Sequence, residues 1–200
     1  MLDQTTIESI ADELVQADLD RAVLPKLTSR YPGMVIEDSY AIQKVWSDRR
    51  IAAGARLVGH KIGLTSKVMQ LATGISEPDY GVIHDDMVYE SGSVLEFDRY
   101  SNVRIEVELA FVLAKPLTGP NVTIFDVLDA TAYVVPALEV LNSHLELEGR
   151  TIVDTISDNA AMGAMVVGGR PVKIDQTDLT WASALLYRNE TIEDSGVAGA

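Results

Sequence analysis

The segment from Arg104 to Phe111 places an apolar side chain at every second position, and this alternation constrains the fold more than any other feature of the chain. In a β-strand, residues i and i+2 project to the same side, about 7 Å apart. The period of two therefore predicts a strand in which Glu106 and Glu108 share one face, while the apolar side chains point to the other.

Two neighbouring carboxylates on a strand face have two interpretations. Exposed strands commonly turn charged side chains toward water, whereas buried carboxylates need a counter-charge, which a divalent cation can supply. A third glutamate, Glu139, lies in the otherwise apolar run 132–141, where an acid usually has a strong partner unless it reaches solvent at the end of the element. Glu106, Glu108 and Glu139 could thus hold Mg²⁺ or Mn²⁺ with coordination positions left open for substrate. Zinc is disfavoured, because the chain has no cysteine and its three histidines lack the ligand spacing of zinc sites.

Ionisable side chains also lie among turn-forming residues in two short segments, 59–67 and 76–81. Lys61 is a candidate proton carrier, because a lysine beside a metal-bound electrophile can exchange protons near neutrality. Asp79 is a second candidate, either as a base that activates water or as an acid that protonates carbon. Each also has an ordinary interpretation, Lys61 as a surface lysine and Asp79 as part of a turn after Pro78.

Five sequence words, in this order and at this spacing, carry a resemblance to a known family. They are GHKIGLTSK (59–67), ISEPDYG (75–81), RIEVELAFVLAKPL (104–117), ALEVL (137–141) and DTISDNAA (154–161). From about residue 30 to its end, the chain resembles the 2-keto-4-pentenoate hydratase family of the fumarylacetoacetate hydrolase superfamily. The likeness is nearest to members that act on 2-oxohept-4-ene-1,7-dioate.

The resemblance implies an enzyme that adds water to a 2-hydroxy-2,4-dienoate, or to its 2-oxo-enoate tautomer, in aromatic meta-cleavage catabolism. It also implies roles for individual residues. The expected metal ligands are Glu106, Glu108 and Glu139, the expected catalytic residues are Lys61, Asp79 and His60, and the expected substrate-binding residues are Arg104, Leu64 and Thr65. For Arg104, an ion pair with the glutamates is the alternative.

Two other functions remain open at this stage. The first is a 4-oxalocrotonate-type decarboxylase on the same scaffold, although His60 and Asp79 favour the hydratase. The second is a non-catalytic subunit that uses the metal for structure alone. The resemblance further implies a homo-oligomer built on pentamers and a possible association with a pathway decarboxylase.

The composition fits a small-molecule enzyme. A chain of 200 residues with 47% hydrophobic content can bury the core of one domain. The formal charge of −14 argues against nucleic acid or an anionic membrane as partners, and an anionic substrate would need a locally positive site. No apolar stretch is long enough to span a membrane, the N-terminus does not resemble a signal peptide, and the absence of cysteine fits the cytoplasm.

Hydrophobic periodicity predicts an α+β fold. A helix is expected over 5–22, with Thr5 and Glu8 as a capping box, and another over 36–53, with Gly54 as its C-cap. Strand-rich runs follow at 58–64, 86–89, 93–96, 104–113, 133–141 and 164–167, with a brief helix at 126–131 and a hairpin over 181–194. Residues 1–56 would thus form a helical N-terminal part, and residues 57–200 a catalytic region, which the resemblance implies to be a mixed β-roll.

The end of the chain carries one more expectation. It stops shortly after the expected hairpin, whereas members of the resembled family continue through further strands. We therefore expect a C-terminal truncation that would leave strand edges unpaired and make the 200-residue chain unstable or inactive by itself.

Overall fold

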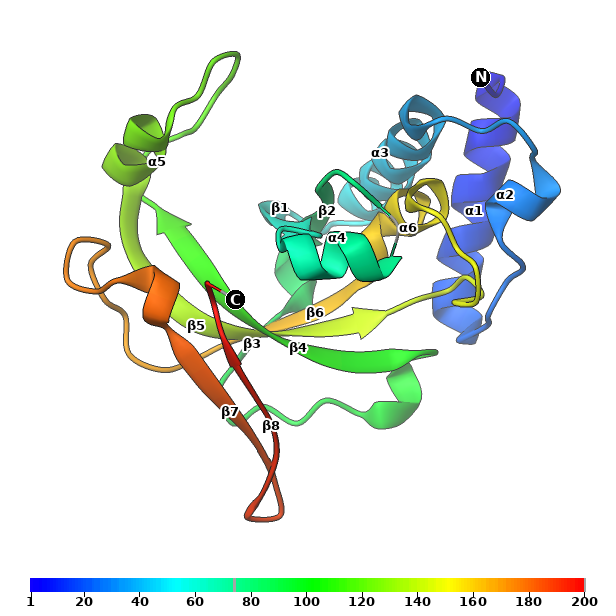
Figure 1. Ribbon diagram of the computed structural model, residues 1–200. Helices are drawn as coiled ribbons and strands as arrows, with labels where there is room; N and C mark the ends of the chain where they lie inside the picture. The colour runs from blue at the N-terminus through cyan, green and yellow to red at the C-terminus, as the bar shows by residue number, and fades with distance from the viewer. Residues whose placement is uncertain (74, 200) are drawn as a thin grey trace. The chain divides into compact units, whose positions relative to one another are not determined.

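The computed structural model describes residues 1–73 and 75–199, in which helices and strands are mixed (Figure 1). The α+β class expected from the sequence is therefore confirmed. The chain divides into two compact units, one made of Met1–Glu106 and Glu139–Val166, the other of Val107–Leu138 and Val167–Ala200. None of the helices in the described residues combines the length and apolar character needed to cross a membrane.

The first unit begins with helices α1 (Gln4–Asp20), α2 (Leu27–Arg30) and α3 (Ile36–Ala52). Both long helices were predicted to within two residues. The expected capping box was wrong, because Asp3 is the N-cap of α1 and its carboxylate accepts a hydrogen bond from the backbone N–H of Thr6 at 2.9 Å. Gly54 does follow the end of α3, with a left-handed φ of 110°.

The core of this unit is formed where the apolar faces of α1 and α3 meet the strands. Its fully buried members include Ile10, Leu14, Leu27, Ile42 and Leu145. Helix α6 (Ile152–Ser157), which periodicity did not predict, packs against α3. Trp46 of α3 is buried, and the guanidinium of Arg50 lies 5.1 Å from the centre of its ring.

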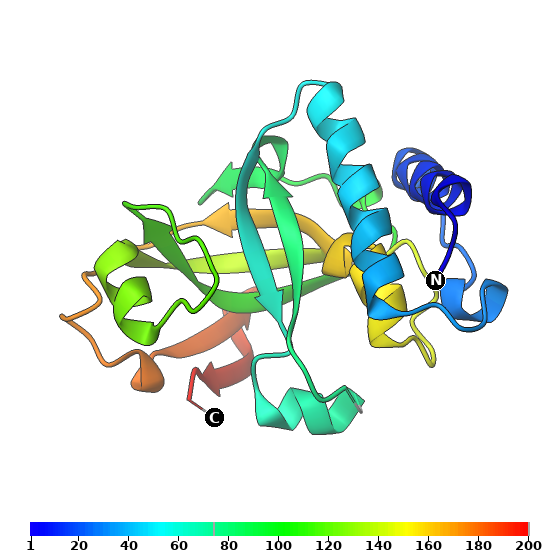
Figure 2. The same cartoon turned by 90° about the horizontal axis from the view of Figure 1, so that it is seen from above.

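An antiparallel ribbon next to α3 is formed by β1 (Leu57–Gly63) and β2 (Asp79–His84) (Figure 2). The strand expected at 58–64 is confirmed as β1. The interpretation of Asp79 as part of a turn was wrong, because Asp79 is the first residue of β2 and pairs with Gly63. The residues around Asp79 are typical of a turn, but here they form a strand through pairing with β1. Helix α4 (Lys67–Thr73) lies between the two strands in sequence and was also missed.

A four-stranded sheet has the strand order β3-β6-β5-β4. Its strands are β3 (Val88–Glu90), β6 (Met162–Val167), β5 (Thr131–Asn142) and β4 (Val103–Leu113). Three of the four were predicted nearly to their ends, and the run at 86–89 was predicted only in part, because a 3-10 turn precedes β3. The strand expected at 93–96 was wrong, because that segment is irregular. Its apolar side chain Val94 is 81% exposed and is therefore not packed in the core.

The second unit includes α5 (Ile124–Ala130) and the hairpin of β7 (Ser183–Arg188) and β8 (Thr191–Val197). Both features were predicted. The hairpin turns at Asn189 and Glu190, which have left-handed φ values of 48° and 66°. Trp181, in a 3-10 turn before β7, is 75% exposed.

Candidate active site

Three glutamates from neighbouring strands come together on the four-stranded sheet. Alternation along β4 places Glu106 and Glu108 on one face, and β5, which contains Glu139, is next to β4 in the sheet. Their carboxylate oxygens lie within 4.8 Å of one another. Glu139 is buried, whereas the other two side chains are exposed, so the cluster is open to solvent on one side.

The donor set fits a hard divalent cation. All three groups are carboxylates, and oxygen ligands are those that Mg²⁺ and Mn²⁺ prefer. Three negative charges at this spacing repel one another unless a cation lies among them. The exposed side of the cluster leaves room for water or substrate as further ligands.

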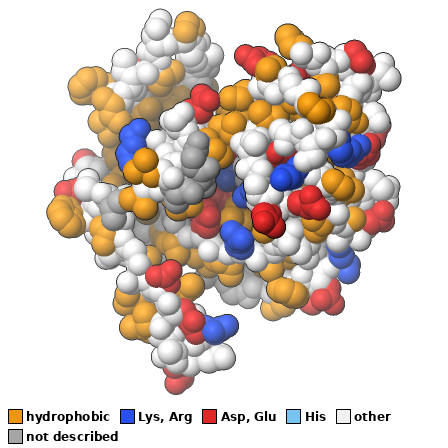
Figure 3. Space-filling model, turned by 45° about the vertical axis from the view of Figure 1, so that its right-hand side comes forward, with side chains coloured by type: hydrophobic (Ala, Val, Ile, Leu, Met, Phe, Trp, Pro, Cys, Tyr) orange, Lys and Arg blue, Asp and Glu red, His pale blue; other side chains and the backbone are white. Residues whose placement is uncertain are grey.

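Lys61 provides the basic group beside these glutamates. Its Nζ lies 3.2 Å from Oε1 of Glu139, and the two side chains are only 13% and 7% exposed. The interpretation of Lys61 as a surface lysine was therefore wrong. Figure 3 shows acidic and basic side chains gathered near the middle of the face that it draws.

Asp79 lies on the same face of the β1–β2 ribbon as Lys61. The register pairs Lys61 with Gly81 and Gly63 with Asp79, so the two ionisable residues are diagonal neighbours. Asp79 is 3% exposed, and neither of its carboxylate oxygens makes a hydrogen bond to a described residue. Burial raises the pKa of Asp79, although the charges of Lys61 and Arg150 oppose this effect. The protonated carboxyl is thus favoured to a higher pH than in an exposed aspartate.

Two glycines make room for this arrangement. A Cβ at Gly63 would collide with Oδ1 of Asp79 and lie 3.4 Å from Nζ of Lys61. A Cβ at Gly81 would lie 2.5 Å from the backbone oxygen of Asn159. Both glycines belong to the sequence words that carry the resemblance, but their roles could not be read from those words, because the contacts come from other elements.

Asn159, which lies 77 residues after Val82 in the sequence, holds β2 in place through hydrogen bonds. Its side-chain amide donates to the carbonyl of Val82 at 2.9 Å, and the N–H of Val82 donates to its Oδ1 at 2.8 Å. Asn159, Ala160 and Ala161 all have left-handed φ values, of 49°, 52° and 58°. The signal that could have indicated this turn is the asparagine followed by two small residues in DTISDNAA, because asparagine tolerates the left-handed region well.

His60 does not join Lys61 and Asp79. It is the neighbour of Lys61 on β1, so its side chain projects to the other face of the ribbon. There it is exposed, and its ring lies 5.9 Å from that of Tyr80, which stacks on Tyr40 at 4.5 Å. The geometry therefore gives no support to a direct catalytic role for His60.

The three residues expected to bind substrate lie near the strand ends. Leu64 directly follows β1 with a left-handed φ of 57°, and its carbonyl accepts a hydrogen bond from Gln70 at 2.9 Å. Thr65 is exposed in the same loop. Arg104 shares the face of β4 with Glu106, but among the described residues it makes no ion pair, with the glutamates or with any other acid.

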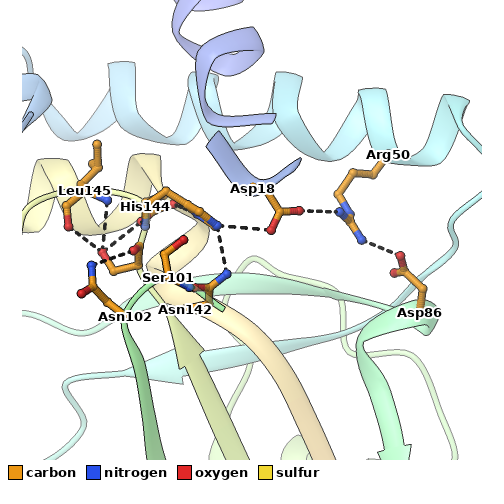
Figure 4. Close-up of polar contacts among 10 residues, drawn as sticks. Asp18, Arg50, Asp86, Ser101, Asn102, Asn142, His144 and Leu145 are labelled. Atoms are coloured by element: carbon orange, nitrogen blue, oxygen red, sulfur yellow. Dashed lines mark hydrogen bonds and ion pairs between the residues drawn. The ribbon is translucent and has the colours of Figure 1, made fainter. Parts of the chain in front are cut away.

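A second polar cluster lies apart from the glutamates and was not predicted (Figure 4). The imidazole of His144 contacts Asp158 at 2.8 Å and Asp18 at 3.2 Å, and the chain of contacts continues from Asp18 to Arg50 and Asp86. Burial alone would lower the pKa of His144, but the hydrogen bonds and charges of Asp158 and Asp18 outweigh it and raise the pKa to about 10. The cluster thus holds a charged imidazolium between two carboxylates.

Comparison with known proteins identifies close relatives. No family model matches the chain. It is 52% identical to a 2-oxo-hept-4-ene-1,7-dioate hydratase from Escherichia coli, over 99% of this chain and 76% of the relative. It is 40% identical to a 2-hydroxypent-2,4-dienoate hydratase from Pseudomonas putida, over 100% of this chain and 90% of the relative.

A solved structure has the same fold. The 4-oxalocrotonate decarboxylase from Pseudomonas putida G7, complexed with magnesium and adipate, matches 99% of this chain and 75% of its own length with a TM-score of 0.94. The two sequences are 28% identical over the match.

Proposed function

Because the chain belongs to the 2-keto-4-pentenoate hydratase family, we propose that it is a hydro-lyase that adds water to a 2-hydroxy-2,4-dienoate or its 2-oxo-enoate tautomer. The product would be a 4-hydroxy-2-oxo acid of aromatic meta-cleavage catabolism. The proposed substrate is 2-oxohept-4-ene-1,7-dioate, since the relative with 52% identity is named for it. One observation carries the proposal: a lysine and an unpaired buried aspartate lie side by side next to a cluster of three carboxylates.

We assign Mg²⁺, with Mn²⁺ as the alternative, to Glu106, Glu108 and Glu139. The decarboxylase of the same fold is complexed with magnesium, which supports this choice of ion class. A divalent cation bound there would stabilise the negative charge that develops on the C2 oxygen during tautomerisation and addition of water. Glu139 would then face both the cation and the ammonium of Lys61.

The residues of the chain itself would move the protons. Addition of water to the conjugated tautomer forms a bond from oxygen to C4, releases one proton from that water and requires one at C3. Burial raises the pKa of Asp79, so its carboxyl keeps a proton to a higher pH than an exposed aspartate does, and we assign to it the donation of a proton to carbon. The proton that the water releases needs an acceptor, and we assign that role to the neutral amine of Lys61, whose Nζ lies at the edge of the glutamate cluster.

An assay of turnover tests this function. The protein is mixed with a 2-hydroxydienedioate, with and without Mg²⁺, while the dienoate absorbance and the product mass are followed. We expect a metal-dependent product one water heavier than the substrate, and loss of turnover in Glu106→Gln, Glu139→Gln and Lys61→Ala. A product lighter by CO₂ would instead identify a decarboxylase, the activity of the protein with TM-score 0.94. No turnover with either metal would favour a non-catalytic subunit.

Several finer features remain proposals. We propose that the four-stranded sheet is part of a β-roll of the fumarylacetoacetate hydrolase type. A catalytic role for His60 and substrate contacts of Leu64 and Thr65 also remain predictions. The same holds for a homo-oligomer built on pentamers, an association with a pathway decarboxylase and a location in the cytoplasm.

A further inference from the structure

Two reciprocal hydrogen bonds join the segment before β4 to the end of β5 (Figure 4). The backbone N–H of Ser101 donates to Oδ1 of Asn142 at 2.7 Å, and Nδ2 of Asn102 donates to the backbone carbonyl of Ser143 at 3.1 Å. In each bond, a side chain of one segment meets the backbone of the other. The two bonds together therefore fix how the two segments lie against each other.

Asn142, the last residue of β5, is enclosed by its neighbours. It is 4% exposed, and its Nδ2 lies 3.0 Å from Nε2 of His144. A Cβ at Gly163 of β6 would lie only 2.7 Å from Cβ of Asn142, so β6 packs directly on this residue because glycine stands there. Turning the amide over would set its N–H donors against the N–H of Ser101, so the hydrogen bond from Ser101 sets its orientation.

The same two strands continue to two carboxylates of the glutamate cluster. On β4, Glu106 follows Asn102 by four residues, and on β5, Glu139 precedes Ser143 by four residues. All of these residues belong to the first unit. The short equal spacing means that the two hydrogen bonds fix the strands close to the point where the two carboxylates meet.

The position of β4 beside β5 has to withstand charge repulsion. β4 lies at the edge of the four-stranded sheet, and β5 is its neighbour there. The carboxylate oxygens of Glu106 and Glu139 lie within 4.8 Å of each other. Until a cation lies among them, their repulsion opposes the close approach of the two strands, and the hydrogen bonds of Asn142 and Asn102 resist it.

We propose that Asn142 and Asn102 are positioning residues for the metal site, which hold Glu106 and Glu139 at the separation that one divalent cation needs. The inference rests on the assignment of Mg²⁺ or Mn²⁺ to the glutamates, which is part of the proposed function. It adds two residues outside the glutamate cluster that set the affinity of the site. A site whose ligands are held before the cation arrives binds it more tightly, because less conformational freedom is lost on binding.

The affinity of the folded protein for the cation separates positioning from ordinary stabilisation. Titration calorimetry with MgCl₂, and separately with MnCl₂, measures Kd for wild type and for Asn142→Leu, a variant of similar size that cannot accept the hydrogen bond of Ser101. We expect Kd to rise about tenfold or more, as for loss of other groups that orient metal ligands. An unchanged Kd would mean that Asn142 serves stability alone and would overturn the inference.

Two further variants keep the test decisive if Asn142→Leu does not fold. Asn142→Asp keeps an oxygen for the N–H of Ser101 and offers a second one to the imidazolium of His144, so its Kd should stay within about threefold of wild type. Asn102→Ala removes the other hydrogen bond at a less buried position and should raise Kd about threefold or more. A Kd like that of wild type in Asn102→Ala would contradict its role.

Ile10→Val is the matched control for a loss of stability. Ile10 is fully buried in α1 and takes part in neither hydrogen bond. Removing one of its methyl groups lowers the free energy of unfolding, but the Kd for Mg²⁺ should equal that of wild type. A rise as large as in Asn142→Leu would show that lost stability by itself weakens the site, and the inference would fail.

The same titrations distinguish a failure of this inference from a failure of the proposed function. If wild type binds neither Mg²⁺ nor Mn²⁺, the assignment of the cation fails and the inference fails with it. If wild type and Asn142→Leu bind the cation equally well, only the inference fails. If Asn142→Leu binds it more weakly but wild type hydrates no dienoate, the inference stands and the hydratase function fails. Where turnover is present, the Mg²⁺ concentration for half-maximal rate should rise in Asn142→Leu by the same factor as Kd.

Discussion

At the scale of single residues, Asp79 combines burial with unpaired carboxylate oxygens. Because the pKa of its carboxyl is raised in the folded protein, its contribution to stability is complete below the pKa of the unfolded chain. That contribution is lost as the pH rises through the folded-state pKa. The buried acid thus costs stability at neutral pH, which is consistent with a residue kept for catalysis.

Asp79→Asn should therefore separate activity from stability. We expect kcat to fall about 10²- to 10⁴-fold, the usual effect of removing a general acid. We also expect the free energy of unfolding to exceed that of wild type at pH 8 but not at pH 3, because asparagine has no proton to lose. Urea denaturation at both pH values measures this difference. A variant less stable than wild type at pH 8 would contradict this account of Asp79.

His144 differs from Asp79 in that the folded protein favours its charged form. Its folded-state pKa of about 10 lies above the ordinary value of 6.5, so the charged imidazolium stabilises the fold fully below about pH 6.5. The stabilisation is lost as the pH rises through about 10.

We expect His144→Gln to lower the free energy of unfolding at pH 6 by roughly 3–5 kcal/mol, as for other buried ion pairs that lose one partner. The difference from wild type should shrink steadily as the pH is raised to 10. Urea denaturation at pH 6, 8 and 10 provides the measurement, with His60→Gln as the control at an exposed histidine. A pH-independent difference would mean that packing, and not charge, is what His144 contributes.

At the scale of helices and strands, the sequence predicted those elements whose side chains repeat with a clear period. Helices α1 and α3 and strands β4 and β5 are long enough for the pattern to be read within one segment. Strand β2 was missed because its partner β1 lies earlier in the chain and its first residues resemble a turn. The run at 93–96 was too short for its pattern to be distinguished from chance.

The residues of the candidate site likewise fall into those that the sequence could predict and those that it could not. Glu106, Glu108, Glu139, Lys61 and Asp79 could be proposed from residue type and resemblance alone. The roles of Gly63 and Asn159 could not, because each depends on a contact between segments that are separated in the sequence. The exposed position of His60 was likewise invisible until the pairing of β1 with β2 fixed which face it occupies.

Strand β1 offers a test of how the backbone positions the site. Gly63→Ala should reduce kcat by about tenfold or more, because the added methyl group would displace the carboxylate of Asp79, and small misplacements of catalytic groups are costly. Gly59 lies on the same face of the strand, but a Cβ there would only meet Cδ1 of Ile83 at 3.9 Å, an ordinary contact. Gly59→Ala is thus the matched control, and steady-state kinetics of both variants decide the outcome. Equal activity in the two would show that Asp79 does not need its present position.

At the scale of the whole molecule, a net charge of −14 opposes the approach of a dianionic substrate. The basic residues Lys61, Arg104 and Arg150 all belong to the first unit: Lys61 pairs with Glu139, Arg104 shares a strand face with Glu106, and the charge of Arg150 acts on Asp79. A cation bound by the glutamates would add to the positive charge of these basic residues. With that cation bound, the local charge would differ in sign from that of the protein as a whole, which a count of charges cannot show.

The two tryptophans have a practical consequence for optical spectroscopy. Trp46 is 6% exposed in the first unit, under the guanidinium of Arg50, whereas Trp181 is 75% exposed in the second. A tryptophan shielded from water emits at shorter wavelength than one in contact with water. The blue side of the emission spectrum therefore reports on the unit that contains Lys61 and Asp79, and the red side is weighted toward the other. A single denaturant titration, followed at two wavelengths, reveals whether the two units melt together or in sequence.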